Sequence, residues 1–233
     1  MARAEEDLEA LYDALSELRE RLGGFRYLRE CDGRMEWPAR GVYFFFDERE
    51  LRSSPGLRVV RVGTHALRVS DRTTLWGRLS NHRGHIGGHR PGGGNHRGSV
   101  FRRHVGAALL VRDGDPAGLL PYWKDPTAPK GAIGESEYAV ELSVSGYIGG
   151  LPFVWVPVLD TPGPSSDRGA IESNSIALLS TAGRSIDPAG EEWLGRSAPS
   201  EAVRRSGLWN VRHVGEPYDP AFIATLRGYV EQT

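Results

Sequence analysis

The sequence is poor in cysteine, lysine and long apolar runs, and each scarcity excludes a class of protein. Cys31 is the only cysteine among 233 residues, so neither an intrachain disulfide nor a zinc site built on thiolates can form. No apolar run reaches the ~18–20 residues that span a bilayer. The first seven residues are acidic and polar, unlike a signal peptide. We therefore expect a cytoplasmic protein without membrane contact.

Acidic residues are absent from one long stretch of the chain. None occurs between Asp71 and Asp113, although the formal net charge of the whole chain is only -1. The stretch carries many basic side chains, namely Arg72, Arg78, Arg83, Arg90, Arg97, Arg102, Arg103 and Arg112, with His82, His85, His89, His96 and His104. Because the positive charge is concentrated in one segment, the sequence favours binding to a polyanion such as a nucleic acid.

Two neighbouring segments, residues 41–46 and 57–63, have the composition of paired strands. Both are rich in β-branched and aromatic residues, and a charged turn separates them. The alternation of a strand places Tyr43 and Phe45 on the same face of the sheet. Taken alone, Tyr43 would be an ordinary half-buried strand residue.

A short helix is predicted after these strands. Residues 74–82 have apolar side chains at helical spacing. In such a helix Arg78 and His82 lie one turn apart on the same face. Two strands thus lead into a helix with two groups able to bind phosphate.

These segments, in this order, resemble the GIY-YIG nuclease family. Gly-Val-Tyr at 41–43 stands where the family has Gly-Ile-Tyr, and Arg-Val-Gly at 61–63 stands where it has Tyr-Ile-Gly. Arg78 and His82 match the helix arginine and the residue one turn later in the restriction-endonuclease branch. Downstream, Glu172 lies in a segment that looks like the metal-binding glutamate helix of the family.

The resemblance implies a metal-dependent endonuclease that hydrolyses phosphodiester bonds in DNA. RNA as a substrate is left open. A restriction-like or defence role is expected, with a repair or mobile-element role as the alternative. Tyr43 would orient or deprotonate the attacking water, and Arg78 would neutralise charge on the phosphate. His82 would be a second phosphate contact or a proton carrier. Glu172 would hold a single Mg²⁺ or Mn²⁺, since one carboxylate with waters suits such a hard cation.

The chain departs from the family pattern at named positions. Arg61 replaces the second motif tyrosine; it cannot act as a base but can bind phosphate. Arg184 stands near the place of a downstream asparagine, and the hairpin between the two motifs is long. A catalytically impaired nucleic-acid-binding module that retains the fold therefore stays open. For Glu172, a salt bridge with an arginine is the alternative to a metal.

A glycine-rich segment, residues 83–98, follows the arginine helix and cannot form a regular helix or strand. Glycine allows close approach and arginine grips phosphate, so we expect this insertion to contact nucleic acid. The predicted contacts are Arg83, Arg90, Arg97, Arg102 and Arg103. A solvated surface loop and a zinc site formed by His82, His85, His89 and His96 are the alternatives.

The N-terminal residues 3–22 predict a helix with a leucine stripe at steps of three and four. The stripe either packs on its own domain or forms a contact in a homodimer. If this contact were the main function, the protein would be an interaction domain that does not bind DNA.

The remaining pattern predicts an α+β fold, a small three-stranded sheet flanked by helices. Helices are expected at 99–112, 136–148 and 168–182, a buried strand at 151–159, and a last helix opened by Asp219 and Pro220. We divide the chain into an N-terminal helix and connection (1–37), a nuclease core (38–182) and a C-terminal extension packed on it (183–233).

Overall fold

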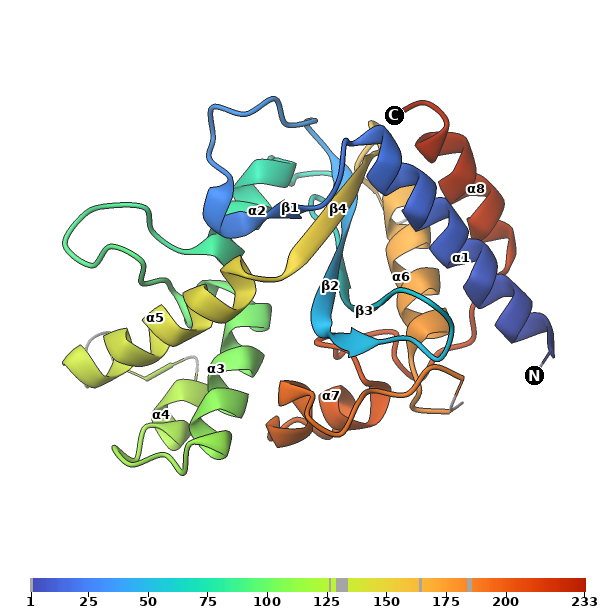
Figure 1. Cartoon of the computed structure of the whole chain (residues 1–233). Helices are drawn as coiled ribbons and strands as arrows, with labels where there is room; N and C mark the ends of the chain where they lie inside the picture. Colours follow the sequence, from blue (N-terminus) through green and yellow to red (C-terminus); the bar gives the residue numbers. More distant parts are fainter. Residues whose placement is uncertain (1, 126, 129–133, 164, 184–185) are drawn as a thin grey trace.

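A computed structural model describes residues 2–125, 127–128, 134–163, 165–183 and 186–233. A sheet of antiparallel strands lies between two groups of helices (Figure 1). The strands are β1 (Arg26–Tyr27), β2 (Gly41–Leu51), β3 (Leu57–Gly63) and β4 (Pro152–Pro157). The α-helices are α1 (Ala2–Arg21), α2 (Leu75–Arg83), α3 (Val100–Arg112), α4 (Leu120–Lys124), α5 (Gly134–Gly149), α6 (Asp167–Leu179), α7 (Glu201–Ser206) and α8 (Ala221–Val230). Short 3-10 turns are η1 (Leu28–Glu30), η2 (His96–Gly98) and η3 (Leu194–Ser197).

The sheet has four strands in the order β1-β4-β2-β3, so the prediction of three strands is wrong by one. The additional strand, β1, has only two residues, which are too few to show an alternating pattern. The segment at 151–159 does contain a buried strand inside the sheet, β4, which ends at Pro157. A proline there donates no ladder hydrogen bond, which is why the strand ends at that residue.

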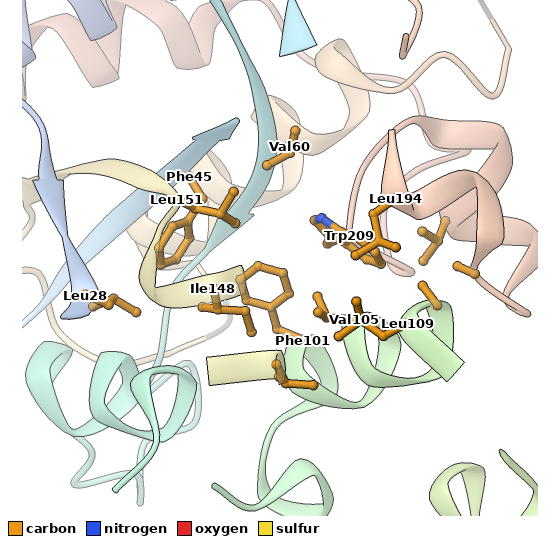
Figure 2. Packing of buried hydrophobic residues seen from close by; sticks show 14 of the residues in the cluster. Leu28, Phe45, Val60, Phe101, Val105, Leu109, Ile148, Leu151, Leu194 and Trp209 are labelled. Atoms are coloured by element: carbon orange, nitrogen blue, oxygen red, sulfur yellow. The ribbon is translucent and has the colours of Figure 1, made fainter. Parts of the chain in front are cut away.

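Each face of the sheet has its own hydrophobic core. Tyr43 and Phe45 lie on the face covered by α2, α3 and α5, as the alternation predicts. On this face Phe101 of α3 and Trp209 of the C-terminal segment belong to the same buried cluster (Figure 2). The other face, with Phe44, packs against α1, α6 and α8. The two cores explain why both faces of β2 are apolar.

The leucine stripe of α1 is buried within its own chain. Leu8, Leu11, Leu15 and Leu18 lie in the core that α1 forms with α6, α8 and the sheet. The first of the two interpretations is therefore confirmed. These four side chains are not accessible to a second chain, so they do not form the alternative dimer contact; a homodimer through another surface stays a prediction.

The C-terminal segment covers the free edge of β3. The backbone N–H of Trp209 donates to the carbonyl of Val60 at 2.8 Å. The amide side chain of Asn210 accepts from the N–H of Val62 at 3.1 Å and donates to its carbonyl at 2.9 Å. The edge strand is thereby closed to pairing with another chain. Within the described part of the chain, no helix is both long and apolar enough to cross a membrane.

Candidate active site at the end of strand β3

The two motif glycines are required by close contacts. A Cβ at Gly41 would lie 2.5 Å from the carbonyl oxygen of Val156 on the paired strand. A Cβ at Gly63 would lie 2.3 Å from the hydroxyl oxygen of Tyr43. Glycine at the end of β3 therefore gives the Tyr43 ring the space to extend across the strand, which places its hydroxyl beside the end of β3.

Tyr43 and His82 form a buried pair. The Tyr43 hydroxyl lies 2.8 Å from Nε2 of His82, and both side chains are fully buried. Burial lowers the pKa of His82 well below its usual value, and the charges of Arg78 and Arg61 act in the same direction. The imidazole is therefore neutral and does not reach solvent. The expectation that His82 contacts phosphate or carries protons with a pKa near neutrality is wrong for this reason.

Arg61 lies on the same face as Tyr43. Its Nη1 donates to the carbonyl of Trp209 at 2.7 Å, and the guanidinium lies 5.1 Å from the centre of the Phe101 ring. Its Nε is buried and makes no hydrogen bond with the described residues. Burial lowers the pKa of Arg61, against the effect of Tyr43. A guanidinium keeps its charge despite such a shift, so Arg61 brings a positive charge and an unused donor to the site.

Arg78 brings a second guanidinium, from α2. Thr74 caps this helix by accepting a hydrogen bond from the backbone N–H of Gly77. Nε of Arg78 is also buried without a hydrogen-bond partner in the described chain. The charge of Arg78 is close enough to lower the pKa of both His82 and Arg61. The site thus contains two cationic groups, each with an Nε that no described residue uses as a donor.

Glu172 reaches the same place from the other side of the sheet. Its helix, α6, covers the face opposite to α2, yet Oε1 accepts from the backbone N–H of Thr64 at 3.1 Å. Thr64 follows directly after β3, so the carboxylate lies at the strand end. Burial raises the pKa of Glu172, while the charge of Arg61 is the largest effect that lowers it. No arginine in the described residues forms an ion pair with Glu172, so a salt bridge does not account for its position.

Three of the five arginines predicted to contact nucleic acid are engaged within the chain. Arg102 is 0% exposed and donates to both the side chain and the carbonyl of Glu141, so its prediction as a nucleic-acid contact is wrong. Arg83 donates to the carbonyl of Leu28 at 2.8 Å. Arg97 forms a largely buried ion pair with Glu137. These guanidinium groups hold the insertion against the rest of the chain.

The other two arginines are more accessible. Arg90 is exposed and lies 3.8 Å from Glu135 and over the ring of Tyr138. Arg103 is half-buried. Arg90 and Arg103 stay predicted contacts with nucleic acid, as does the exposed tip of the insertion at residues 85–91.

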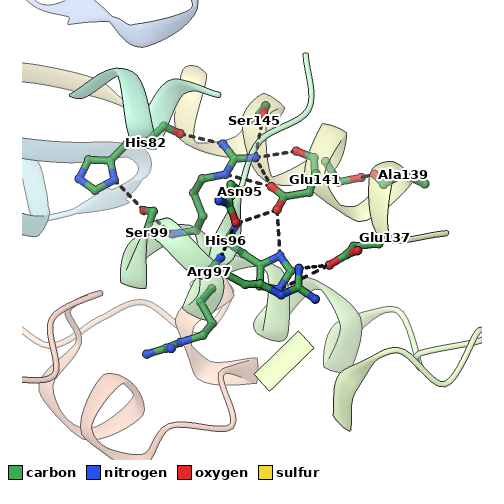
Figure 3. A network of polar contacts seen from close by, with 12 residues as sticks. His82, Asn95, His96, Arg97, Ser99, Glu137, Ala139, Glu141 and Ser145 are labelled. Atoms are coloured by element: carbon green, nitrogen blue, oxygen red, sulfur yellow. Dashed lines mark hydrogen bonds and ion pairs between the residues drawn. The ribbon is translucent and has the colours of Figure 1, made fainter. Parts of the chain in front are cut away.

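A buried polar network fixes the glycine-rich insertion (Figure 3). His96 stacks on Trp123 at 3.7 Å, and its Nδ1 lies 2.9 Å from the carboxylate of Glu141. Tyr138 donates to the carbonyl of Pro91 at 2.7 Å. The described residues contain no group of three or more metal-ligating side chains, so a zinc site formed by the histidines of this insertion is not found there.

Several residues of the site have no signal in the sequence. Thr64 acts through its backbone N–H, which any residue except proline would supply. Trp209 contributes a carbonyl to Arg61 from a segment about 150 positions away, for which no local pattern exists. Ser99 is recognisable as the cap of α3, but not as the partner of His82. Arg184, which stands near the expected asparagine, lies outside the described residues.

The comparisons with known proteins identify the family. No curated protein and no solved structure matches the chain. The family described as GIY-YIG domain matches residues 1–233, so the match includes both ends of the chain, which the short motifs leave unexplained. The chain therefore belongs to the GIY-YIG domain family, and this membership indicates a nuclease that acts on DNA.

Proposed function

We propose that the protein is a metal-dependent endonuclease that hydrolyses phosphodiester bonds in DNA at the end of β3. One observation carries the proposal: the buried Nε groups of Arg61 and Arg78 have no partner among the described residues, and the carboxylate of Glu172 reaches the same strand end without an ion pair. A phosphate group bound at this strand end would be attracted by both guanidinium charges. Their charges would then stabilise the negative charge that grows on the phosphate during hydrolysis.

A divalent cation fits the remaining group. Burial raises the pKa of Glu172, so a bound cation would relieve the cost of keeping this carboxylate charged. One carboxylate completed by waters is a suitable ligand set for a single Mg²⁺ or Mn²⁺. When bound, such an ion polarises a phosphoryl oxygen and stabilises the leaving oxygen.

Tyr43 is the group best placed to act on the attacking water. Its hydroxyl oxygen lies beside Gly63, one residue before the N–H that binds Glu172. With its hydrogen in place, the Tyr43 hydroxyl would orient the water. After giving that hydrogen to bulk water, it would accept the proton of the attacking water, while Arg61 and Arg78 hold the phosphate. His82 would act on Tyr43 and not on the substrate, because its Nε2 contacts the Tyr43 hydroxyl and its Nδ1 contacts Ser99.

The test is cleavage of duplex DNA by the purified protein with Mg²⁺, compared with Tyr43→Phe. Loss of a group that handles the proton of the attacking water should lower the cleavage rate about a hundredfold. The matched control is Tyr122→Phe, because Tyr122 is 52% exposed and lies in α4. Equal rates for Tyr43→Phe and the wild type would overturn the role of Tyr43.

The same assay separates catalysis from binding alone. A module that has lost catalysis would bind DNA with a steep salt dependence and leave it intact. The replacement of the second motif tyrosine by Arg61 is the feature that favours this second function. An RNA duplex of the same sequence, run in parallel, decides between the two nucleic acids. The restriction-like role rests on the Arg78–His82 spacing alone, and sequence-specific cutting of duplex DNA would support it.

A further inference from the structure

A chain of three hydrogen-bonding side chains runs from the candidate site into α3. The hydroxyl oxygen of Tyr43 lies 2.8 Å from Nε2 of His82, and Nδ1 of the same ring lies 2.8 Å from Oγ of Ser99. Figure 3 shows the contact between His82 and Ser99. His82 and Ser99 are 0% exposed, so water cannot replace a partner lost from the contact between them.

The hydrogen-bond inventory of Ser99 favours one direction of this chain. Oγ of Ser99 already accepts the backbone N–H of Arg102 at 3.2 Å, as the cap of α3. Its hydroxyl hydrogen needs an acceptor, and Nδ1 of His82 is the other partner of this oxygen among the described residues. If Nδ1 carried a hydrogen, the hydroxyl would be left as a buried donor without an acceptor, which is unfavourable.

We propose that Ser99 is a positioning residue, which holds His82 in the tautomer with its hydrogen on Nε2 and so makes His82 a hydrogen-bond donor to the hydroxyl oxygen of Tyr43. Ser99 donates to Nδ1, and Nε2–H then points at Tyr43. The imidazole stays neutral in this environment, since burial and the charges of Arg78, Arg61 and Arg102 disfavour a second proton on it.

The backbone of His82 is held by Arg102 of α3, the helix that Ser99 caps. Nη1 of Arg102 donates to the carbonyl of His82 at 2.8 Å. Nε of Arg102 donates to Glu141 of α5 at 3.0 Å, and Nη2 donates to Ser145 at 2.9 Å. Burial alone would raise the pKa of Glu141, but the hydrogen bonds from His96 and Arg102 keep it below its usual value, so the carboxylate stays charged. Ser99 is fixed as the cap of α3, and His82 is fixed through Arg102, which α5 holds in place.

The consequence for the reaction rests on the proposed nuclease function. A donor at the Tyr43 oxygen stabilises the negative charge left there when the hydroxyl gives its hydrogen to water at the end of β3. It also prevents the Tyr43 hydroxyl from donating to His82, so that the hydrogen of this hydroxyl takes its acceptor from the water or phosphate bound at the end of β3. Ser99 would influence catalysis through His82 and Tyr43, without contact to the substrate.

The direct test is the nitrogen NMR spectrum of the imidazole rings in the metal-free protein, with His82→Gln to assign the His82 signals. The wild type should show hydrogen on Nε2 and none on Nδ1.

The variants of Ser99 test the cause of this preference. Ser99→Thr, which keeps the hydroxyl and the cap, should show the same tautomer. In Ser99→Ala the two tautomers should mix. Thr74→Ala, which removes the cap of α2 but no partner of His82, should keep the wild-type tautomer. A wild-type protein with hydrogen on Nδ1, or an unchanged His82 in Ser99→Ala, would overturn the proposal.

Cleavage kinetics provide the second readout. For Ser99→Ala we expect kcat to fall about tenfold with KM changed less than about twofold, since the residue acts only in the proton transfer. Ser99→Thr should restore kcat to within about threefold of the wild type. A fall in kcat that Thr does not rescue, although it keeps the tautomer, would contradict the role of the hydroxyl. If no variant cleaves DNA, the nuclease function fails, whereas the tautomer measurement still decides the role of Ser99.

Discussion

The hydroxyl of Tyr43 occupies the space that a side chain at position 63 would need. The two residues pair across β2 and β3, and a Cβ at Gly63 would come within 2.3 Å of the hydroxyl oxygen. The glycine of the second motif is therefore explained by the tyrosine of the first. The motifs lie twenty residues apart in sequence but describe one contact.

Replacing Gly63 by alanine should displace the Tyr43 ring from its position. We expect the free energy of unfolding to fall by about 1–3 kcal/mol, the usual cost of an additional atom in a packed interior, and DNA cleavage to fall with it. Urea denaturation measures the first effect. Gly215→Ala is the matched control, because a Cβ there would meet nothing within 4 Å. Equal stability of Gly63→Ala and Gly215→Ala would show that the contact is not tight.

Replacing Arg78 by alanine should remove charge stabilisation at the phosphate. Loss of one such group lowers kcat by about 10²–10³ in comparable sites. Single-turnover cleavage under saturating protein separates this effect from DNA binding. Arg227→Ala serves as the control, since Arg227 is exposed on α8, on the other face of the sheet. A change confined to DNA affinity would assign Arg78 to binding and not to the reaction.

Replacing Glu141 by glutamine should destabilise the whole insertion. The variant leaves the guanidinium of Arg102 fully buried without its carboxylate, and such a broken pair costs about 3–5 kcal/mol. Thermal and urea unfolding measure the loss. In the control variant Glu201→Gln, the affected pair with Arg205 is exposed, and we expect a change below about 1 kcal/mol. Similar small losses in both variants would mean that solvent reaches Arg102.

The stability of the protein should fall as the pH decreases from about 6.5 to about 4, in part because of His65. Burial lowers the pKa of His65 from 6.5 to about 4. Between these two pH values His65 is therefore protonated in the unfolded chain and neutral in the folded protein. Folding is therefore favoured at the higher pH. By about pH 5, protonation of His65 in the unfolded chain should lower the free energy of unfolding by about 2 kcal/mol.

The measurement is the free energy of unfolding at about pH 7 and about pH 5 for the wild type and His65→Gln. The variant should show the smaller difference between the two conditions. His89→Gln is the control, because His89 is exposed at the tip of the insertion. If His65→Gln and the wild type lose the same amount of stability, His65 is not the group that resists protonation.

The sequence predicts those features of the fold that have a local period. The helices at 99–112 and 136–148 and the strand at 151–159 appear as α3, α5 and β4 with small shifts of their ends. Burial of charged residues has no such signal. Arg102 and Arg103 are adjacent and chemically identical, but Arg102 is buried because Glu141, on another helix, lies opposite to it. Only the tertiary contact distinguishes the two.

The order of the motifs likewise predicts the candidate site only in part. It indicates that Tyr43, Arg78 and Glu172 belong to one site, but it does not show that α2 and α6 lie on opposite faces of the sheet. The residues meet because the Glu172 side chain reaches the backbone just after β3, at Thr64. Such a contact around a strand end depends on the three-dimensional path of the chain and leaves no pattern in the sequence.

The most direct test of the central claim is cleavage of plasmid DNA with Mg²⁺ by the wild type and by Glu172→Gln, with DNA binding measured on the same samples. The control is Glu216→Gln, whose carboxylate is exposed and contacts His213. The proposal predicts that the wild type and Glu216→Gln cut the plasmid, that chelation of the metal stops both, and that Glu172→Gln binds DNA but leaves it intact. Cleavage by Glu172→Gln at the wild-type rate would contradict the account.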